Sequence, residues 1–78
     1  MKTGLKLVVN ITLNGDPHKV QKGQRLFDLL QDLKLDPGKV AVERNLEIVP
    51  KSTYQDIKLD EGDRLEIVHF IGGGKKYG

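Results

Sequence analysis

The sequence predicts an α+β domain in which one helix packs across one face of a mixed sheet of about four to five strands. Two observations predict the strands. An apolar residue recurs at every second position over 5–13, and a strand-like run, RLEIVHFI, covers 64–71. A third observation predicts the helix, because leucines recur at helical spacing over 26–33.

The first predicted strand is half-buried and runs into a hairpin. Its inward residues are Leu5, Leu7, Val9, Ile11 and Leu13. Asn14-Gly15 follows, which is the strongest short signal for a two-residue hairpin because both residues tolerate positive φ. Residues 16–22 then form a short strand with Val20 inward, and Pro17 near its start suits an edge position.

The predicted helix opens at Gly23 and is about eleven residues long. Its apolar stripe consists of Leu26, Leu29, Leu30 and Leu33. It ends near Leu35, because Asp36-Pro37-Gly38 breaks the pattern. Asp28 and Asp32 lie on its polar face, where a solvated surface is the expected environment.

The second half of the chain supplies the remaining strands. A strand over 39–45 places Val40 and Val42 inward and Arg44 at its end, with the charged head in water and no function expected there. Asn45 begins a turn into a short run, 47–50. From the irregular segment and the last strand, the side chains expected to reach the core are Tyr54, Ile57, Leu65 and Ile67.

The first and last strands are the most apolar, so we expect them side by side and parallel in the centre of the sheet. With one helix across one face, this is the β-grasp, or ubiquitin-like, arrangement. Residues 1–71 form the predicted β-grasp domain, and 72–78 form a flexible, glycine-containing tail. The fold alone does not determine the function.

Composition excludes several classes of function. The chain has 78 residues, no cysteine and two widely spaced histidines, so we expect no disulfide, no metal site and no cofactor. The net charge is +2, but without Lys75 and Lys76 the 13 Lys and Arg become 11, equal to the 11 Asp and Glu. With this mixed charge and few aromatics, nucleic-acid binding is not expected.

The N-terminal apolar stretch is too short to span a membrane and lacks a small-residue cleavage pattern. We therefore expect no signal peptide and no membrane partner, and the missing cysteines fit a cytoplasmic location.

No catalytic residue is predicted. Ser52 is the only serine and has no GxSxG motif around it. Gly72-Gly73-Gly74 follows a strand but matches neither a GxGxxG nor a P-loop pattern. The chain is therefore not expected to be an enzyme.

The last strand directs a second set of side chains away from the helix. Glu66, Val68 and Phe70 alternate with its inward residues, and Ala41 and Glu43 lie beside them on the neighbouring strand. Scattered exposed apolar side chains are ordinary in small domains. Together with the glycine tail that leaves the same strand, they favour a surface on which a partner docks.

The three tail glycines allow two interpretations. They could be a plain flexible tail. Alternatively, because glycine has no Cβ, Gly72, Gly73 and Gly74 could pass through a narrow channel and present an accessible carboxylate.

Two stretches, VAVERNLEIVP and GDRLEIVHFIGGG, resemble the ThiS family, the sulfur carriers of thiamine thiazole biosynthesis. The resemblance runs from about Leu7 to Gly74 and includes the Asn14-Gly15 hairpin, the LFDLLQDL helix and Tyr54. The combination in this order is specific, whereas each piece alone is not. A MoaD-like carrier of molybdopterin synthesis shares the fold and the Gly-Gly end but matches VERNLEIVP and EIVHF less well.

The resemblance implies a carrier whose own C-terminus reacts. In such families a ThiF-like adenylating enzyme uses ATP to activate the terminal carboxylate, and a cysteine desulfurase-linked donor then supplies the sulfur of a thiocarboxylate. A ThiG-like thiazole synthase takes that sulfur into the thiazole ring. On this analogy Gly74 carries the sulfur, Gly72 and Gly73 thread the partner's channel, and Val68 and Phe70 dock on the partner. A monomer is expected when the chain is free.

The sequence departs from this pattern after Gly74, because Lys75-Lys76-Tyr77-Gly78 follows where ThiS chains usually end. A protease could remove these residues, or they could be an idle extension. Gly78 is disfavoured as the charged residue because Tyr77 would have to enter a channel built for glycine. Two other classes stay open: a ubiquitin-like modifier that ends in an isopeptide bond, and a plain interaction or RNA-binding domain that needs no glycine end.

Overall fold

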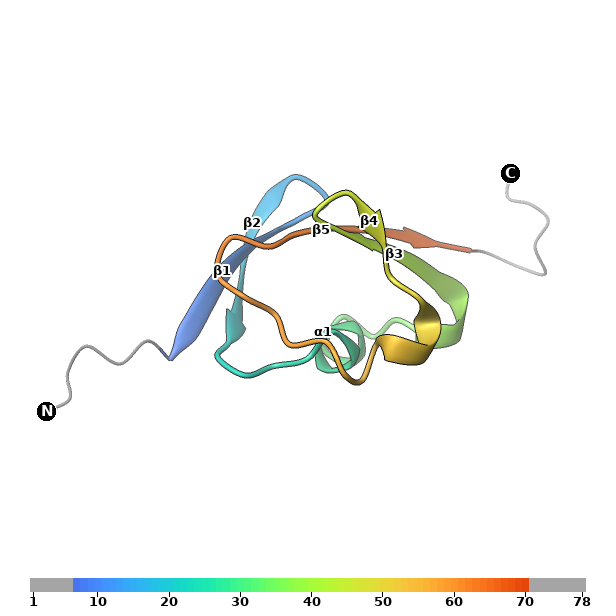
Figure 1. The fold of residues 1–78 in the computed structure, drawn as a ribbon, viewed down its shortest axis with the longest axis horizontal. Coiled ribbons are helices and arrows are strands. Elements are labelled where there is room, and N and C mark those ends of the chain that lie inside the picture. The colour runs from blue at the N-terminus through green and yellow to red at the C-terminus, as the bar shows by residue number, and fades with distance from the viewer. Residues whose placement is uncertain (1–6, 71–78) are drawn as a thin grey trace, which may run out of the picture.

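Two strands from opposite ends of the chain meet in the centre of the sheet. The structure is a computed structural model and describes residues 7–70. Within that range, β1 (Val8–Leu13) lies parallel to β5 (Arg64–His69), and the five-stranded sheet has the order β2-β1-β5-β3-β4 (Figure 1). The predicted central, parallel pair is therefore confirmed.

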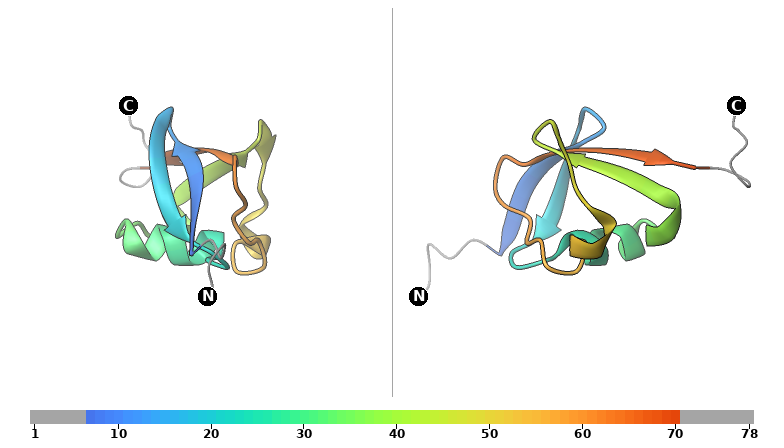
Figure 2. Two further views of the ribbon diagram at one scale, coloured as in Figure 1. Left: turned by 90° about the vertical axis from the view of Figure 1, so that its left-hand side faces the viewer. Right: turned by 45° about the vertical axis from the view of Figure 1, so that its right-hand side comes forward.

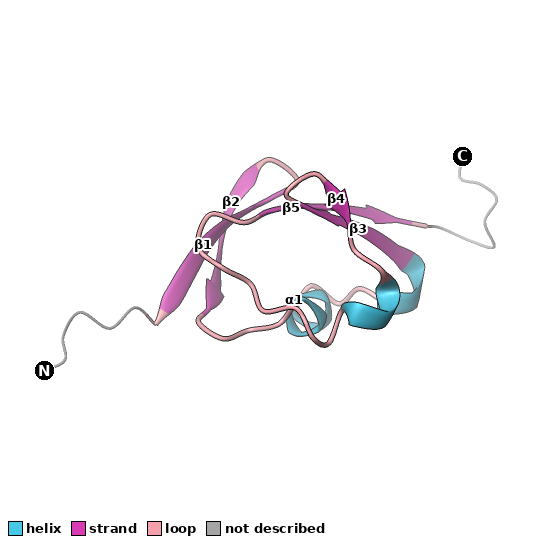
Figure 3. Ribbon diagram, in the orientation of Figure 1, coloured by secondary structure: helices cyan, strands magenta, loops and turns pink. Residues whose placement is uncertain are grey.

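The other elements complete the layers around this pair. β2 (Asp16–Gln21) is antiparallel to β1, and β3 (Val40–Arg44) is antiparallel to β5. β4 (Glu47–Ile48) pairs with the end of β3 and forms the far edge. The helix α1 (Leu26–Asp32) lies against one face of the sheet, so that the domain has two layers (Figure 3).

The β1–β2 hairpin forms at Asn14 and Gly15, as predicted. Their φ values are 49° and 87°, both in the left-handed region that a two-residue hairpin turn requires. The Asn14 amide has a second role. Its Oδ1 accepts a hydrogen bond from the Ile67 N–H (2.7 Å), and its Nδ2 donates to the Ile67 carbonyl (3.3 Å). The turn is thereby tied to the central strand.

The helix is shorter than predicted, beginning at Leu26 and ending at Asp32 rather than near Leu35. Lys34 adopts φ 63°, and its N–H donates to the Gln31 carbonyl while the Leu35 N–H donates to the Leu30 carbonyl. This pair of bonds closes a helix C-terminus that usually contains glycine at the left-handed position, which is why the sequence did not reveal it. Among residues 7–70, no helix is long and apolar enough to cross a membrane.

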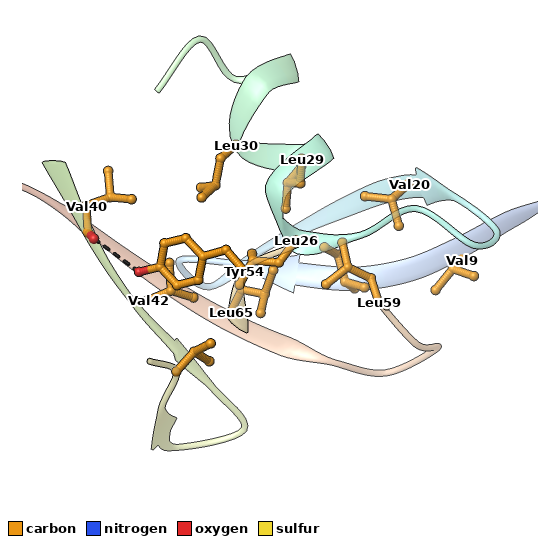
Figure 4. Packing of buried hydrophobic residues seen from close by; sticks show 12 residues of the cluster. Val9, Val20, Leu26, Leu29, Leu30, Val40, Val42, Tyr54, Leu59 and Leu65 are labelled. Carbon is orange, nitrogen blue, oxygen red and sulfur yellow. Dashed lines mark hydrogen bonds between the residues drawn. The ribbon is translucent and has the colours of Figure 1, made fainter. Parts of the chain in front are cut away.

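The core lies between α1 and the sheet (Figure 4). Its buried residues are Val9, Ile11, Val20, Leu26, Leu29, Leu30, Val40, Val42, Val49, Tyr54, Leu59 and Leu65. The predicted inward residues Leu13, Leu33, Ile57 and Ile67 are partly buried against this cluster. The alternation and the helical stripe therefore predicted most of the core correctly.

Leu7 was predicted inward, and that prediction is wrong, because its side chain is 75% exposed. It precedes the first residue of β1, and Figure 1 shows this end of the strand projecting away from α1. Alternation predicts the direction of a side chain, but burial also requires a covering layer. Leu5 lies outside the described residues.

Arg44 ends β3, as predicted, but its head does not simply reach water. Its Nε donates to Asp63 Oδ2 (3.0 Å), and its Nη2 donates to Asp60 Oδ2 (3.1 Å) and to the Lys58 carbonyl (3.1 Å). Asp63 is buried and also accepts from Asn45 Nδ2 (3.1 Å) and from the Asp60 N–H (2.8 Å). This cluster fixes the turn that leads into β5.

Tyr54 follows the short 3-10 turn Lys51–Thr53 and inserts its ring into the core. Its hydroxyl donates to the Val40 carbonyl at 3.1 Å, as Figure 4 shows. The β4 pairing covers only Glu43 and Arg44, so this hydroxyl satisfies a β3 carbonyl that β4 does not reach. Burial raises the pKa of Tyr54, and a hydrogen bond with the backbone at Val42 partly opposes it.

We predict that Tyr54→Phe lowers the free energy of unfolding at neutral pH by about 0.5–1.5 kcal/mol, the usual net value of one hydrogen bond. Because folding raises the pKa of Tyr54, its protonated form stabilises the fold fully below a pH of about 10, the unfolded value. That contribution is lost as the pH rises through the folded value. Urea denaturation at several pH values should show a shallower alkaline loss in Tyr54→Phe; an identical alkaline loss would contradict this assignment.

A second prediction uses the two carboxylates that share Arg44. Asp63→Ala should cost about 3–5 kcal/mol, because it leaves a half-buried guanidinium without its buried partner. Asp60→Ala is the matched control and should cost about 0–1 kcal/mol, since the Asp60 side chain is 74% exposed. Thermal and urea denaturation measure both, and equal effects would show that burial does not distinguish the two ion pairs.

Candidate partner-docking face and glycine arm

One face of the sheet carries α1, and the opposite face is open (Figure 2). Along β5, Leu65 is buried, whereas Val68 is 56% exposed and Phe70, just beyond the strand, is 43% exposed. On β3, Ala41 is paired with Val68 and therefore shares its face. The predicted inward and outward directions of the last strand are confirmed.

Two exposed apolar residues that the sequence reasoning missed extend this surface. Leu46 is 71% exposed and Ile48 is 78% exposed. With the residues already predicted, they line a shallow hollow of about 370 Å³. Its lining residues are Ala41, Val42, Glu43, Leu46, Ile48, Glu66 and Val68. We call this hollow together with Phe70 the open face.

The β3–β4 hairpin places the two missed residues there. Asn45 and Leu46 both have positive φ, 52° and 73°, so they form a two-residue turn. Ile48 is then paired with Glu43, whose side chain already points to the open face. The alternation of Leu46, Glu47 and Ile48 was a signal that could have revealed this, but a two-residue strand is too short to be recognised by periodicity.

Two carboxylates lie among the apolar residues of the open face. Glu43 on β3 is directly paired with Glu66 on β5, and both side chains line the hollow. Like charges at directly opposed positions destabilise a sheet. The open face therefore combines an apolar surface with an acidic pair that a cation from outside would stabilise.

Phe70 is held in place at the end of the open face. Its N–H donates to the Lys39 carbonyl at 2.7 Å, which continues the β3–β5 ladder beyond the last strand residue. The Lys51 ammonium lies 5.7 Å from the centroid of the Phe70 ring and donates to the Gly38 carbonyl (2.9 Å). The described chain thus ends in an extended segment fixed on its β3 side.

The predicted arm residues Gly72, Gly73 and Gly74 lie outside the described residues, as do residues 75–78. The described chain ends at Phe70, one residue beyond the central strand β5. Figure 1 shows β5 extending to this end of the described chain. The residues predicted to dock on a partner, Ala41, Glu66, Val68 and Phe70, lie on β3 and on β5 and its continuation.

The acidic residues of α1 each have a local partner. Asp28 Oδ2 accepts from the Arg25 N–H (3.1 Å), at the start of the helix. Asp32 Oδ2 accepts from Gln24 Nε2 (2.7 Å). Within residues 7–70, no group of three or more acidic or histidine side chains could hold a metal ion.

Comparison with known families gives a match over most of the chain. A family model described as the ThiS family matches residues 11–74. The match includes the whole open face and ends at Gly74.

Individual relatives are matched over different shares of their own length. A thiazole synthase from Magnetococcus marinus is 49% identical over 67 residues, which is 86% of this chain but 21% of the synthase, so this chain spans about a fifth of that relative. The sulfur carrier protein ThiS from Bacillus subtilis is 43% identical over 65 residues, which is 82% of this chain and 98% of that protein.

A crystal structure of the thiamine biosynthesis protein ThiS from Geobacter metallireducens superposes with a TM-score of 0.72 and 32% identity, covering 85% of this chain and all of that one. This likeness confirms the predicted β-grasp fold. Because the family model spans most of the sequence and the Bacillus relative is matched over nearly its whole length, the chain belongs to the ThiS family.

Proposed function

We propose that this chain is a sulfur carrier of thiamine biosynthesis and that it acts as a substrate of its partners rather than as an enzyme. The observation that carries this proposal is the match to the Bacillus sulfur carrier over 98% of that protein. The fold supports it, because the sheet presents an open face beside the root of a glycine arm. A cytoplasmic location follows from the same proposal.

The reacting group in this proposal is the carboxylate of Gly74, the last residue that the family model matches. A carboxylate is unreactive until one of its oxygens bonds to the α-phosphorus of ATP, with release of pyrophosphate. A persulfide sulfur of the cysteine desulfurase-linked donor can then attack the acyl carbon and displace AMP, which gives an acyl disulfide. A thiol of the donor system would cleave its S–S bond, releasing the thiocarboxylate while the two donor sulfurs form a disulfide. The arm supplies access, because Gly72 and Gly73 carry no Cβ to block a narrow channel.

The sulfur acceptor in this proposal is a thiazole synthase. Its thiazole ring would form from the thiocarboxylate sulfur together with deoxyxylulose phosphate and an imine of glycine. Support comes from the thiazole synthases of two bacteria, each of which is similar to this chain over about a fifth of its length. A carrier segment within a synthase chain would keep the two at high effective concentration.

Residues 75–78 must be absent from the reactive form. While Lys75 follows, Gly74 has an amide where the carboxylate is needed. We propose that proteolysis after Gly74 releases that carboxylate. The working unit is then the β-grasp domain, 1–71, with the remaining glycines as its arm.

The open face is the proposed docking surface. Val68 and Phe70 supply apolar contact area next to the arm, and Ala41, which is paired with Val68, lines the hollow together with it. Glu66, paired with Glu43, would be neutralised by a lysine or arginine of the partner. Leu46 and Ile48 enlarge the same surface.

The chemical part of the proposal is tested by intact-mass spectrometry. A chain ending at Gly74 should gain the mass of one oxygen-to-sulfur exchange when it is incubated with a ThiF-like enzyme, ATP and a sulfur source. The full chain should not, and deleting Gly73 and Gly74 should abolish the change without much effect on the melting temperature. No mass change in the Gly74-ending chain would refute the carrier role, and adducts with other proteins would indicate a modifier.

The docking part is tested with truncations on the open face. Phe70→Ala and Ile48→Ala should each weaken binding to the adenylating enzyme by about 1–2 kcal/mol, or about 5- to 30-fold. Ile48→Ala should change the free energy of unfolding by no more than about 0.5 kcal/mol, because its side chain is 78% exposed. Phe70→Ala should cost about 1 kcal/mol, because its side chain is 43% exposed and its ring faces Lys51. Leu7→Ala is the matched control, an exposed apolar residue outside the open face. Calorimetric titration gives the affinities, and unchanged binding in both variants would place the docking surface elsewhere.

A further inference from the structure

Two carboxylates lie side by side in the middle of the open face. Glu43 on β3 is directly opposite Glu66 on β5, and both side chains line the hollow. Directly opposed residues of antiparallel strands have their Cβ atoms about 4.5–5.5 Å apart. Both residues are exposed, so water solvates the two charges in the free chain. A partner that covers the hollow removes that water.

The described part of the chain supplies no cation to this pair. Within residues 7–70, neither Glu43 nor Glu66 forms a hydrogen bond or an ion pair through its side chain. Arg44, on the same strand as Glu43, bonds two aspartates of the loop before β5 instead. Arg64 precedes Glu66 by two residues and shares its face, yet it forms no ion pair with either glutamate.

Apolar side chains surround the two carboxylates. The next outward pair along the same two strands is Ala41 with Val68, and Ile48 on β4 is opposite Glu43. Leu46 completes the apolar lining of the hollow. The apolar residues of this surface therefore cannot be covered without covering the glutamates as well.

Covering the pair without a compensating charge would be unfavourable. Taking an ionised carboxylate out of water costs far more than one apolar contact contributes, and here two carboxylates would lose water together. The repulsion between them would also grow as the local dielectric constant falls. A protein surface that docks on the open face must therefore bring a cation to this position.

We propose that the open face takes up an arginine of the enzyme that activates Gly74, and that its guanidinium bonds Glu43 and Glu66 together. A guanidinium presents five N–H donors in a planar fork, and its weak hydration makes it less costly to desolvate than the ammonium of lysine. The methylene groups of the arginine would lie against Val68 and Ile48. This inference rests on the proposed function, because it names the partner group that the docking surface selects.

Calorimetric titration of the chain ending at Gly74 with a ThiF-like enzyme tests this pairing. Glu43→Gln and Glu66→Gln each keep the side-chain shape and remove one charge, and each should weaken binding by at least about tenfold. Glu47→Gln is the matched control, because it removes the same charge from an exposed glutamate of β4 that does not line the hollow. It should change the affinity by less than about twofold. Equal effects of all three substitutions would reflect net charge alone and would overturn the proposal.

The stability of the free chain gives an independent readout. Because Glu43 and Glu66 repel one another there, Glu66→Gln should leave the melting temperature unchanged or raise it. The variant should thus keep or gain stability while it loses affinity, a combination that damage to the fold would not produce. A lower melting temperature would show that Glu66 has a favourable partner within the chain, and the proposal would then be wrong.

Other occupants of the hollow give different results. If Lys75 or Lys76 of this chain bonded the pair, Glu66→Gln would destabilise the full chain and leave the chain ending at Gly74 unchanged. If a second copy bonded the pair, sedimentation would show a wild-type dimer that the double variant, Glu43→Gln with Glu66→Gln, does not form. Either result would contradict an arginine of the enzyme.

Chemical modification of the enzyme distinguishes arginine from lysine. Phenylglyoxal blocks arginine side chains, and acetylation blocks the amines of lysine. Phenylglyoxal treatment should remove the difference in affinity between the wild-type chain and the double variant, whereas acetylation should preserve it. If acetylation alone removes the difference, the cation is a lysine and the arginine assignment fails.

Adenylation separates this inference from the proposed function. If the wild-type chain ending at Gly74 is not adenylated at all, the carrier role fails, and the arginine site of an activating enzyme fails with it. If the wild-type chain and the double variant are bound and adenylated equally well, the carrier role stands and only the arginine site fails.

Discussion

The parallel contact between β1 and β5 is the constraint on which the rest of the domain depends. It consists of two residue pairs, yet it joins segments separated by most of the chain. Backbone bonds from Thr12 N–H to the Asp63 carbonyl (2.9 Å) and from Asn14 N–H to the Leu65 carbonyl (2.8 Å) support it. Bringing β1 and β5 together closes a long loop and costs conformational entropy, which contacts within the intervening local structure do not offset. The Asn14 amide and the Arg44–Asp63 cluster stabilise the segments on either side of this contact.

In this arrangement one face of the sheet contributes to stability, and the other face stays available for binding. The helix covers one face with Leu26, Leu29 and Leu30, all fully buried, and a single helix leaves the other face open. A second layer on that face would bury more apolar area and remove the opposed Glu43 and Glu66 from water at a high cost. The open face is therefore suited to contacts that form and dissociate, which the proposed carrier would need if it binds more than one partner.

The sequence was sufficient for those features that follow from periodicity. The alternation over β1 and β5 and the leucine stripe of α1 predicted the layers, the central parallel pair and the direction of Val68 and Phe70. Features set by a few atoms of long-range contact could not be predicted. The helix ends early because Lys34 adopts a left-handed conformation, and no glycine at that position signals this in the sequence. The ion pairs of Arg44 depend on Asp60 and Asp63, which lie in a loop distant in the sequence.

The candidate site was predictable to a similar degree. Ala41, Glu66, Val68 and Phe70 could be assigned to one face because each lies on a recognisable strand. Leu46 and Ile48 were missed because their position depends on a two-residue turn in which leucine adopts φ 73°. Burial was harder to predict than side-chain direction, as Leu7 shows. The periodicity of apolar residues shows which residues share a face, but it does not show where the layer that covers this face ends.

The attachment of the arm to the central strand also has a mechanical consequence. In the proposed function, an enzyme that draws the glycines into its channel would pull along the axis of β5. The five residue pairs with β3 and the two with β1 run alongside that axis, so the load falls on them together instead of opening them one after another. A strand at the edge of the sheet has hydrogen bonds on one side only and would separate more easily under the same force. Because β5 is paired on both sides, the folded domain would resist a force applied to its C-terminus.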